Sequence, residues 1–245
     1  PMPILSIEQK LEKRIVSRFN KAIYDYHLIE DGDRLLVGLS GGKDSLCLLE
    51  LLAARQKIKR PDFTVEALHI RMENIKYETD TSYLSDFCAS RGVRLHLVTT
   101  GFDSSTDDRK SPCFLCSWNR RKQMFLKAQE LGCNKIALGH HMDDIIHTAM
   151  MNIFFQGSFS AMPVRLKMRK MPLTIIRPLC LEEERDLRQY SVNKEYRKQV
   201  KLCPYETDSH RADMKELFDK VEAMNGEARY SVWNALEKGG KLIED

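Results

Sequence analysis

The stretch Leu39-Ser-Gly-Gly-Lys-Asp-Ser45 is the most distinctive motif of this 245-residue chain. It follows the mostly apolar run 34–38 and precedes the apolar run 46–52, so it joins a buried strand to a helix. Its two glycines permit positive φ angles and close approach of a ligand to the backbone, its serines supply hydroxyl groups, and the helix directs N–H groups towards an anion. The spacing is not the G-x-x-x-x-G-K-S/T of the common phosphate loop. The complete string nevertheless favours a phosphate-binding loop over a plain capped turn.

Strands and helices alternate along the rest of the chain. The sequence predicts strands at 34–39, 63–70, 94–98, 135–139 and 173–177, separated by helices near 43–56, 78–91, 117–131 and 142–155. Such βαβ units form a parallel sheet with right-handed crossovers, and ligands bind beyond the carboxyl ends of its strands where the strand order reverses. An amphipathic helix is predicted over 5–28, and only helices are predicted beyond Pro178. We therefore expect an α/β fold with a doubly wound, mostly parallel sheet, organised as an N-terminal helical segment (1–30), a phosphate-loop domain (31–180) and a C-terminal helical extension (181–245).

Composition narrows the class of protein. The chain is 42% hydrophobic and 30% charged, which is typical of a globular protein with a sizeable core. No apolar stretch approaches the roughly 20 residues that span a bilayer, and the first residues lack the basic and apolar regions of a signal peptide. We expect a cytoplasmic protein that does not contact membranes. Its seven cysteines are then better explained by metal binding or catalysis than by a disulfide framework.

Charge is unevenly distributed along the chain. Residues 109–211 hold 19 Lys and Arg against 10 Asp and Glu, a surplus of +9, whereas the remaining residues hold 20 against 25, giving −5 and the total of +4. A basic second half is typical of proteins that bind a polyanion, and RNA is the natural candidate. Solvated helix faces are the alternative explanation of the same charges.

A second stretch, Ser111-Pro-Cys-Phe-Leu-Cys-Ser-Trp-Asn-Arg-Arg-Lys122, carries a C-x-x-C pair. Cys113 and Cys116 can reach one metal or form a redox pair, and Cys203 is the best candidate for a third ligand. Three thiolates without an obvious fourth leave an open coordination position, which on a catalytic metal or cluster is where substrate binds. The other cysteines lie among apolar residues and are predicted to be small core residues: Cys47, Cys88, Cys133 and Cys180.

Two residues near this pair have more than one interpretation. Arg120 lies one helical turn after Cys116 and can place a cation between a metal site and a nucleotide. Trp118 is predicted to be a core or interface residue, with stacking on a nucleobase as the alternative. The apolar stripe within 150–155 indicates core or subunit packing, and a homodimer is one form that packing can take.

A third stretch, Leu138-Gly-His-His-Met-Asp-Asp144, ends a strand and begins a helix. An acidic pair there can bind Mg²⁺ or orient the phosphates of a ligand, and the imidazoles can contact the same ligand. A structural Asp cap is the alternative. We favour Asp143 as the functional carboxylate and Asp144 as the cap.

In this order the motifs resemble a known family. Ser40-Gly-Gly-Lys-Asp-Ser45 is similar to the PP-loop of the N-type ATP pyrophosphatases, which have the adenine-nucleotide alpha hydrolase-like fold and cleave ATP between its α and β phosphates. The series S-G-G-K-D-S, P-C-x-x-C-S-x-x-R-R, L-G-H-H-x-D-D, I-R-P-L and C-P-Y with a downstream Arg, over residues 8 to about 211, resembles the TtcA family of tRNA 2-thiocytidine synthetases. The C-P-Y-E form of the last motif differs from the C-x-x-C of some members and indicates a diverged subgroup.

The resemblance implies an activity and a set of site residues. It implies that the enzyme adenylates the C2 oxygen of cytidine 32 in the tRNA anticodon loop, and that sulfur presented at a [4Fe-4S] cluster replaces this oxygen. Cys113, Cys116 and Cys203 are then the cluster ligands. Asp44, Asp143 and Arg120 are the catalytic candidates, with Mg²⁺ organised by Asp44. The candidates for binding ATP and pyrophosphate are Ser40, Gly41, Gly42, Lys43, Asp44, Ser45, His140 and His141.

The implied partners are tRNA and a sulfide source such as a cysteine desulfurase. Two other functions stay open from the sequence. One is a different tRNA-modifying ATP pyrophosphatase, of the thiouridine or lysidine type, whose cysteines bind structural zinc. The other is a non-catalytic RNA-binding module with a vestigial nucleotide site.

Overall fold

The computed structural model describes residues 4–73, 76–78, 80–103, 105, 109–202 and 210–245. Its helices are α1 (Ile7–Asp25), α2 (Lys43–Gln56), α3 (Thr81–Ala89), α4 (Pro112–Leu131), α5 (Met142–Gln156), α6 (Glu184–Asn193), α7 (Arg211–Met224) and α8 (Ala228–Lys238). Its strands are β1 (Arg34–Gly38), β2 (Thr64–Met72), β3 (Lys76–Glu78), β4 (Arg94–Thr100), β5 (Lys135–Ala137), β6 (Arg165–Lys167), β7 (Thr174–Ile176), β8 (Val200–Leu202) and β9 (Ile243–Glu244).

Seven strands form one sheet in the order β4-β2-β1-β5-β7-β6-β9. The strands β4, β2, β1, β5 and β7 are parallel, β6 is antiparallel to β7, and β9 adds in parallel to β6. The chain builds outwards from β1 through β2 to β4 and then returns to place β5 on the other side of β1. The strand order therefore reverses between β1 and β5, where Val37 pairs with both Ala67 and Ala137. This doubly wound, mostly parallel sheet confirms the expected fold class.

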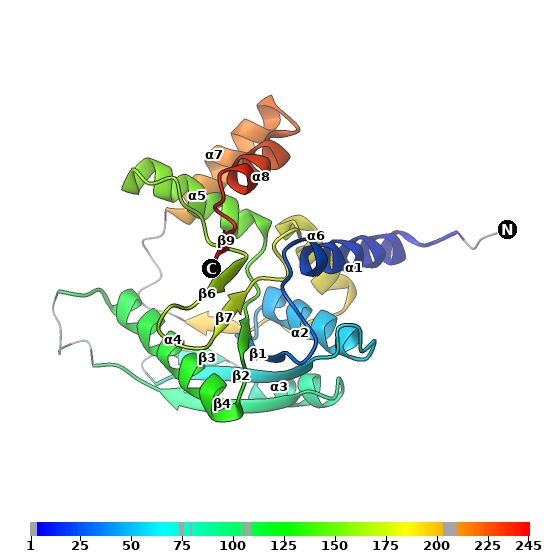
Figure 1. The fold of residues 1–245 in the computed structure, drawn as a ribbon, viewed down its shortest axis with the longest axis vertical. Helices are drawn as coiled ribbons and strands as arrows, with labels where there is room; N and C mark the ends of the chain where they lie inside the picture. The colour runs from blue at the N-terminus through cyan, green and yellow to red at the C-terminus, as the bar shows by residue number, and fades with distance from the viewer. Residues whose placement is uncertain (1–3, 74–75, 79, 104, 106–108, 203–209) are drawn as a thin grey trace.

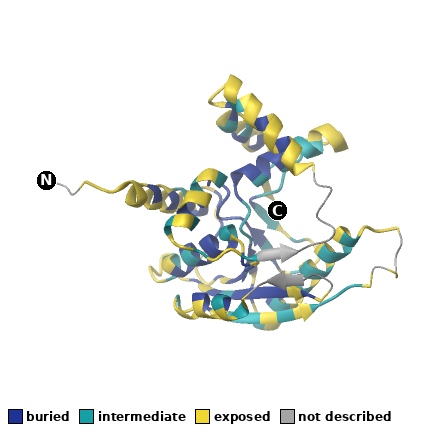
Figure 2. Cartoon of the chain, turned by 180° about the vertical axis from the view of Figure 1, so that it is seen from behind, coloured by how far each residue is buried: buried dark blue, intermediate teal, exposed yellow. Residues whose placement is uncertain are grey.

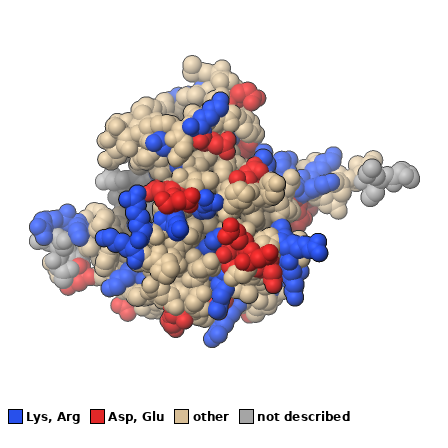
Figure 3. All heavy atoms as spheres, viewed as in Figure 1, with Lys and Arg blue, Asp and Glu red and all other residues tan. Residues whose placement is uncertain are grey.

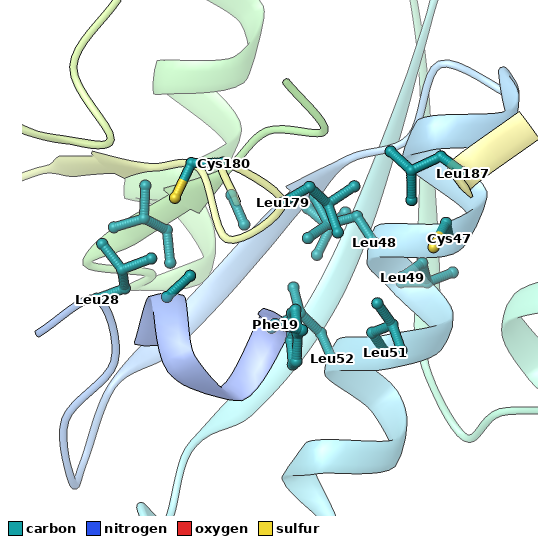
Figure 4. Close-up of a cluster of buried hydrophobic side chains, with 14 of the residues drawn as sticks. Phe19, Leu28, Cys47, Leu48, Leu49, Leu51, Leu52, Leu179, Cys180 and Leu187 are labelled. Atoms are coloured by element: carbon teal, nitrogen blue, oxygen red, sulfur yellow. The ribbon is translucent and has the colours of Figure 1, made fainter. Parts of the chain in front are cut away.

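Both faces of the sheet are covered, and β1 shows why. Leu35 and Val37 point into a core shared with α1 and α2, whereas Leu36 points into a second core beneath α4. A strand buried on both faces is a continuous apolar run, as this one is. Figure 4 shows the larger core at the contact of α1 and α2, where Phe19 meets Leu52. Figure 2 shows the buried residues concentrated in the central strands and on the inner sides of the helices.

Two features of the sequence prediction are wrong. The segment beyond Pro178 is not purely helical, because β8 pairs with β3 in a two-stranded sheet and β9 joins the edge of the main sheet. Helix α4 begins at Pro112, five residues earlier than predicted, because Ser111 caps it and Pro112 occupies its first turn. Cys113 and Cys116 therefore lie within the first turns of a helix and not in a loop before it.

The other packing predictions have mixed outcomes. Cys47, Cys88, Cys133 and Cys180 are all buried, which confirms them as core residues. The stripe within 150–155 is half-buried at its start, but its last three apolar residues are 45–59% exposed: Ile153, Phe154 and Phe155. That part is not core, and packing against a second copy stays a prediction. None of the helices in the described ranges is long and apolar enough to cross a membrane.

Candidate active site

The conformation of the loop 40–45 is stabilised by hydrogen bonds between its own hydroxyl groups and its backbone. The Ser45 hydroxyl donates to the Gly42 carbonyl over 3.0 Å and accepts the Gly41 N–H, and the Ser40 hydroxyl accepts the Gly42 N–H. Gly41 has a φ of +93°, in the region that favours glycine. Gly42 caps α2 without any side-chain hydrogen bond to the helix N–H groups. The positive end of a 14-residue helix therefore faces the loop, ready for an anion.

The loop and the third stretch meet at Gly139. A Cβ at this position would lie 3.1–3.2 Å from backbone atoms of Asp44 and Ser45, so only glycine lets the two segments pack this closely. The strand ends of β1 and β5 thus bring the phosphate loop and the His-His-Met-Asp-Asp stretch to one place. That place is the point where the strand order reverses, as the sequence predicts.

A cavity of about 280 Å³ opens at this point. The carboxyl ends of the central strands supply an apolar floor that includes Leu68, Ile70 and Leu138, and α4 supplies Arg120 and Met124 as one wall. The loop, His140 and the carboxylates Asp44 and Asp144 supply the polar rim. An apolar pocket with a few polar groups on one side suits a flat base attached to a charged tail.

A second, strongly polar cavity of about 260 Å³ adjoins the first. Its charged lining combines three cations from two elements with four carboxylates: Lys43, Arg211, Lys215, Asp44, Asp143, Asp144 and Glu184. Asp44 and Asp144 line both cavities. The two carboxylates thus stand at the boundary between an apolar chamber and a charged one of mixed sign.

Burial and mutual repulsion destabilise the two carboxylates at this boundary. Burial raises the pKa of Asp44, while His141 and Lys43 oppose that rise. The Oδ1 atom of Asp44 is buried and makes no hydrogen bond, although Lys43 Nζ lies 3.1 Å away. His141 Nε2 lies 3.6 Å from Asp44 Oδ2 and 3.5 Å from Asp144 Oδ2, so one imidazole lies beside both carboxylates. A cation between these carboxylates would relieve their burial and mutual repulsion.

Asp143, the neighbouring carboxylate, is occupied by structural contacts. Its Oδ2 accepts the Glu184 N–H over 2.8 Å, and its Oδ1 lies 2.9 Å from the Arg229 guanidinium. Burial alone would raise the pKa of Asp143, but the Glu184 N–H and Arg229 outweigh it and lower the pKa. Asp143 therefore joins α5 to α6 and α8, whereas Asp144 combines a capping box with His141 and a place in both cavities. The contacts favour the reverse of the roles that the sequence suggests for this pair.

His140 is a neutral donor. Burial and then Arg177 lower its pKa to about 4, so the ring is uncharged at neutral pH. Its Nδ1 accepts the Arg177 Nε–H over 3.1 Å, which leaves the proton on Nε2. Because His140 lines the apolar cavity, it can donate a hydrogen bond there without bringing a charge.

The cysteine pair lies on the helix that walls the apolar cavity. Cys113 is exposed and Cys116 half-buried in the first turns of α4, and Arg120 follows one turn later in the cavity wall. Cys203 lies outside the described residues. Strand β8 ends at the residue before it, and the Gln199 side chain lies against Gly41 of the loop. In the part of the chain that the structure describes, no three His, Cys, Asp or Glu side chains form a complete metal site.

Sequence reasoning missed several lining residues. The apolar floor, including Leu68 and Ile70, looks like ordinary strand sequence, and only the position of the strand ends marks it. Lys215 lies on a helix whose charged face looks solvated, and His147 lies within the mostly apolar helix α5. Arg177, which sets the tautomer of His140, lies in the quoted I-R-P-L motif, and that motif was the available signal.

Comparison with known proteins gives consistent similarities. A family described as PP-loop domain matches residues 8–198. The chain is 34% identical over 233 residues to tRNA-cytidine(32) 2-sulfurtransferase 1 of Francisella tularensis subsp. novicida (strain U112), covering 93% of this chain and 86% of the relative. It is also 34% identical over 242 residues to tRNA-cytidine(32) 2-sulfurtransferase of Pseudomonas putida (strain W619), covering 96% and 88%. The fold resembles that of the U34-tRNA thiolase NcsA from Methanococcus maripaludis, solved with its [4Fe-4S] cluster, with a TM-score of 0.77 at 24% identity, covering 94% of this chain and 79% of that one.

Proposed function

The chain belongs to the PP-loop family and, within it, to the TtcA family, and from this we propose that it is an ATP-dependent tRNA sulfurtransferase. The substrate we propose is a cytidine of the tRNA anticodon loop, position 32, as the names of the relatives indicate for those proteins. Two bonds change in turn. The C2 oxygen of the base bonds to the α-phosphorus of ATP and pyrophosphate leaves; sulfide then bonds to C2, and the oxygen leaves with AMP.

The observation that carries this proposal is the pair of cavities that share Asp44 and Asp144. An adenosine suits the apolar chamber, and a pyrophosphate can contact Lys43, Arg211 and Lys215 in the second cavity, where a divalent cation would offset the neighbouring carboxylates. In that placement the bond between the α and β phosphates lies at the two carboxylates. The helix α2 and the loop N–H groups then stabilise the charge that grows on the leaving pyrophosphate.

The residues at the boundary fit Mg²⁺. This ion binds one or two carboxylates and takes its other ligands from phosphates and water, so it needs no cage of three protein ligands. The buried Oδ1 of Asp44, which makes no hydrogen bond, is a suitable donor, and Asp144 is a second. When bound, the ion offsets charge on the phosphates. His141 beside both carboxylates keeps them in place.

The cysteines fit an iron–sulfur cluster in their chemistry and spacing. Thiolates are the ligands of such clusters, and Cys113 and Cys116 offer two on adjacent turns of one helix. We propose Cys203 as the third ligand. A cluster held by these cysteines would supply the sulfur that replaces the C2 oxygen. Arg120 lies between the cysteines and the apolar cavity, and its charge holds the phosphate of the adenylated base in position.

The chain's own groups exclude water and orient the base. Neutral His140 donates from Nε2 to an oxygen of the activated intermediate, and the apolar floor keeps hydrolysis from competing with sulfur transfer. The sulfur source we propose is a cysteine desulfurase or another sulfide donor, and the substrate implies work in the cytoplasm.

The direct test measures pyrophosphate release and nucleoside content together. The protein is purified without oxygen and incubated with ATP, Mg²⁺, sulfide and unmodified tRNA. Pyrophosphate release that depends on tRNA, with a thiolated cytidine found by mass spectrometry, is expected. Release with a different modified nucleoside would favour another PP-loop enzyme. Binding of tRNA without any release would favour the RNA-binding module.

A further inference from the structure

The outer face of α4 carries an apolar hollow that the proposed reaction does not use. This hollow, of about 220 Å³, is lined by six side chains among others: Trp118, Arg121, Lys122, Phe125, Leu126 and Met171. We call it the α4 platform. Trp118 is 50% exposed and Leu126 49% exposed, so the indole is not a core residue. Exposed aromatic and aliphatic groups gathered at a hollow mark a surface that binds a partner.

The platform and the nucleotide cavity lie on opposite sides of one helix. Arg120 and Met124, four residues apart, line the cavity, and Cys116 one turn earlier packs against the same core as Met124. Trp118 and Phe125, seven residues apart, form the other side. A molecule whose reacting nucleotide enters the cavity beside the first turns of α4 can therefore reach the platform with a neighbouring part.

The charged residues that line the platform, Arg121 and Lys122, are both positive, and Glu130, which pairs with Lys127, follows the lining residue Gln129. Residues 109–129 contain six Lys and Arg and no Asp or Glu, and residues 145–181 contain five and none. Lys122 Nζ lies 5.3 Å from the centre of the Trp118 ring. Figure 3 shows Lys and Arg side chains gathered on the side of the molecule where Figure 1 draws the start of α4. A cationic rim around exposed rings complements a polyanion with flat, unpaired bases.

We propose that the α4 platform binds an unpaired nucleotide of the RNA substrate, adjacent to the nucleotide that enters the cavity. Its base stacks on Trp118, and its flanking phosphates contact Arg121 and Lys122. This inference rests on the proposed function, because it assumes that RNA is the substrate. It assigns the platform to substrate binding and not to the chemical step.

Binding of an unmodified anticodon stem-loop RNA tests the proposal, measured by fluorescence anisotropy at several salt concentrations. Trp118→Ala should weaken binding about tenfold, and Trp118→Phe should restore most of it, since stacking on an aromatic ring is worth on the order of a factor of 5 to 100 per base. Lys122→Gln should lower the dependence of affinity on salt by about one phosphate contact. Tyr24→Ala and Lys21→Gln remove an exposed ring and an exposed cation from α1, and both should bind as the wild type does.

Tryptophan fluorescence gives a second readout. The chain has two tryptophans, and the other, Trp233, is buried in α8 with its indole N–H donating to Tyr26. RNA should therefore quench the emission of Trp118, and this quenching should be absent in Trp118→Ala. Wild-type affinity in a correctly folded Trp118→Ala variant would overturn the platform and leave the proposed function intact. Failure of the wild-type protein to bind any tRNA would overturn the proposed function as well.

Discussion

Asp44 and Asp143 differ in what their carboxylates contact, so the isosteric variants Asp44→Asn and Asp143→Asn should fail in opposite ways. Asp143 joins three helices through the Glu184 N–H and Arg229, both within 2.9 Å. Asp44 faces both cavities and has a buried oxygen without a hydrogen bond. Asp44→Asn should lose activity and keep its stability. Asp143→Asn should lose stability first.

The loss of stability expected for Asp143→Asn follows from the contacts of Asp143. Removing one partner of a buried ion pair costs about 3–5 kcal/mol. The amide oxygen that the substitution introduces still accepts the Glu184 N–H, and Arg229 keeps Glu222 at 2.8 Å, so we expect a loss at or just below the lower end, about 2–3 kcal/mol. For a chain of this size roughly 2–4 °C of Tm corresponds to each kcal/mol, so Tm should fall by about 4–12 °C.

For Asp44→Asn we expect no loss of stability. Burial raises the pKa of Asp44 in the folded state, so its charge opposes folding at neutral pH and removing that charge leaves Tm unchanged or higher. Pyrophosphate release that depends on tRNA should fall about 100-fold or more, the usual cost of losing a group that stabilises developing charge. Calorimetry and a pyrophosphate assay on both variants make the comparison. A stable, inactive Asp143→Asn beside an unstable, active Asp44→Asn would refute these assignments.

Three further predictions concern separate parts of the molecule. Gly41→Ala should weaken ATP binding in calorimetric titration, because Gly41 has a φ of +93° at which a Cβ is strained; the end of the Gln199 side chain can move aside, so adding Gln199→Ala should recover only part. Burial raises the pKa of Glu182 to about 8, so the free energy of unfolding of the wild type should decline by up to about 4 kcal/mol as pH rises from about 4.5 to 8. The Tm of Glu182→Gln should depend less on pH, and parallel curves of Tm against pH for the two proteins would contradict this. Cys116→Ser should lose bound iron and thiolation but keep pyrophosphate release within a few-fold, and the core variant Cys133→Ala should keep its iron; loss of iron from both would mean that folding, not ligation, is affected.

The sequence was informative where structure is local. The run from Arg34 to Gln56 predicts strand, loop and helix, because the signals for these elements, apolar periodicity and two adjacent glycines, lie within a few neighbouring residues. The start of α4 was also readable, since Ser111 followed by Pro112 is a helix-start signal that the prediction passed over.

The roles of Asp143 and Asp144 were not readable. They are neighbours in sequence and point about 100° apart around α5, so only the packing of α6 and α8 decides which is held by Arg229. The charged lining of the second cavity is equally non-local, because Lys43 and Lys215 come together only through the fold. Trp118 was predicted as core or interface from residue type alone, and its exposure follows from which side of α4 meets the sheet.

Transfer of sulfur to an adenylated cytidine is tested by counting all of its products in one experiment. Protein purified without oxygen and carrying its cluster is incubated in a single turnover with ATP, sulfide and unmodified tRNA, and AMP, pyrophosphate and thiolated cytidine are counted together. We expect equal amounts of all three, with pyrophosphate but no thiolated cytidine from Cys113→Ser. Thiolation by that variant at the wild-type level, or none by cluster-loaded wild-type protein that releases pyrophosphate, would contradict this expectation.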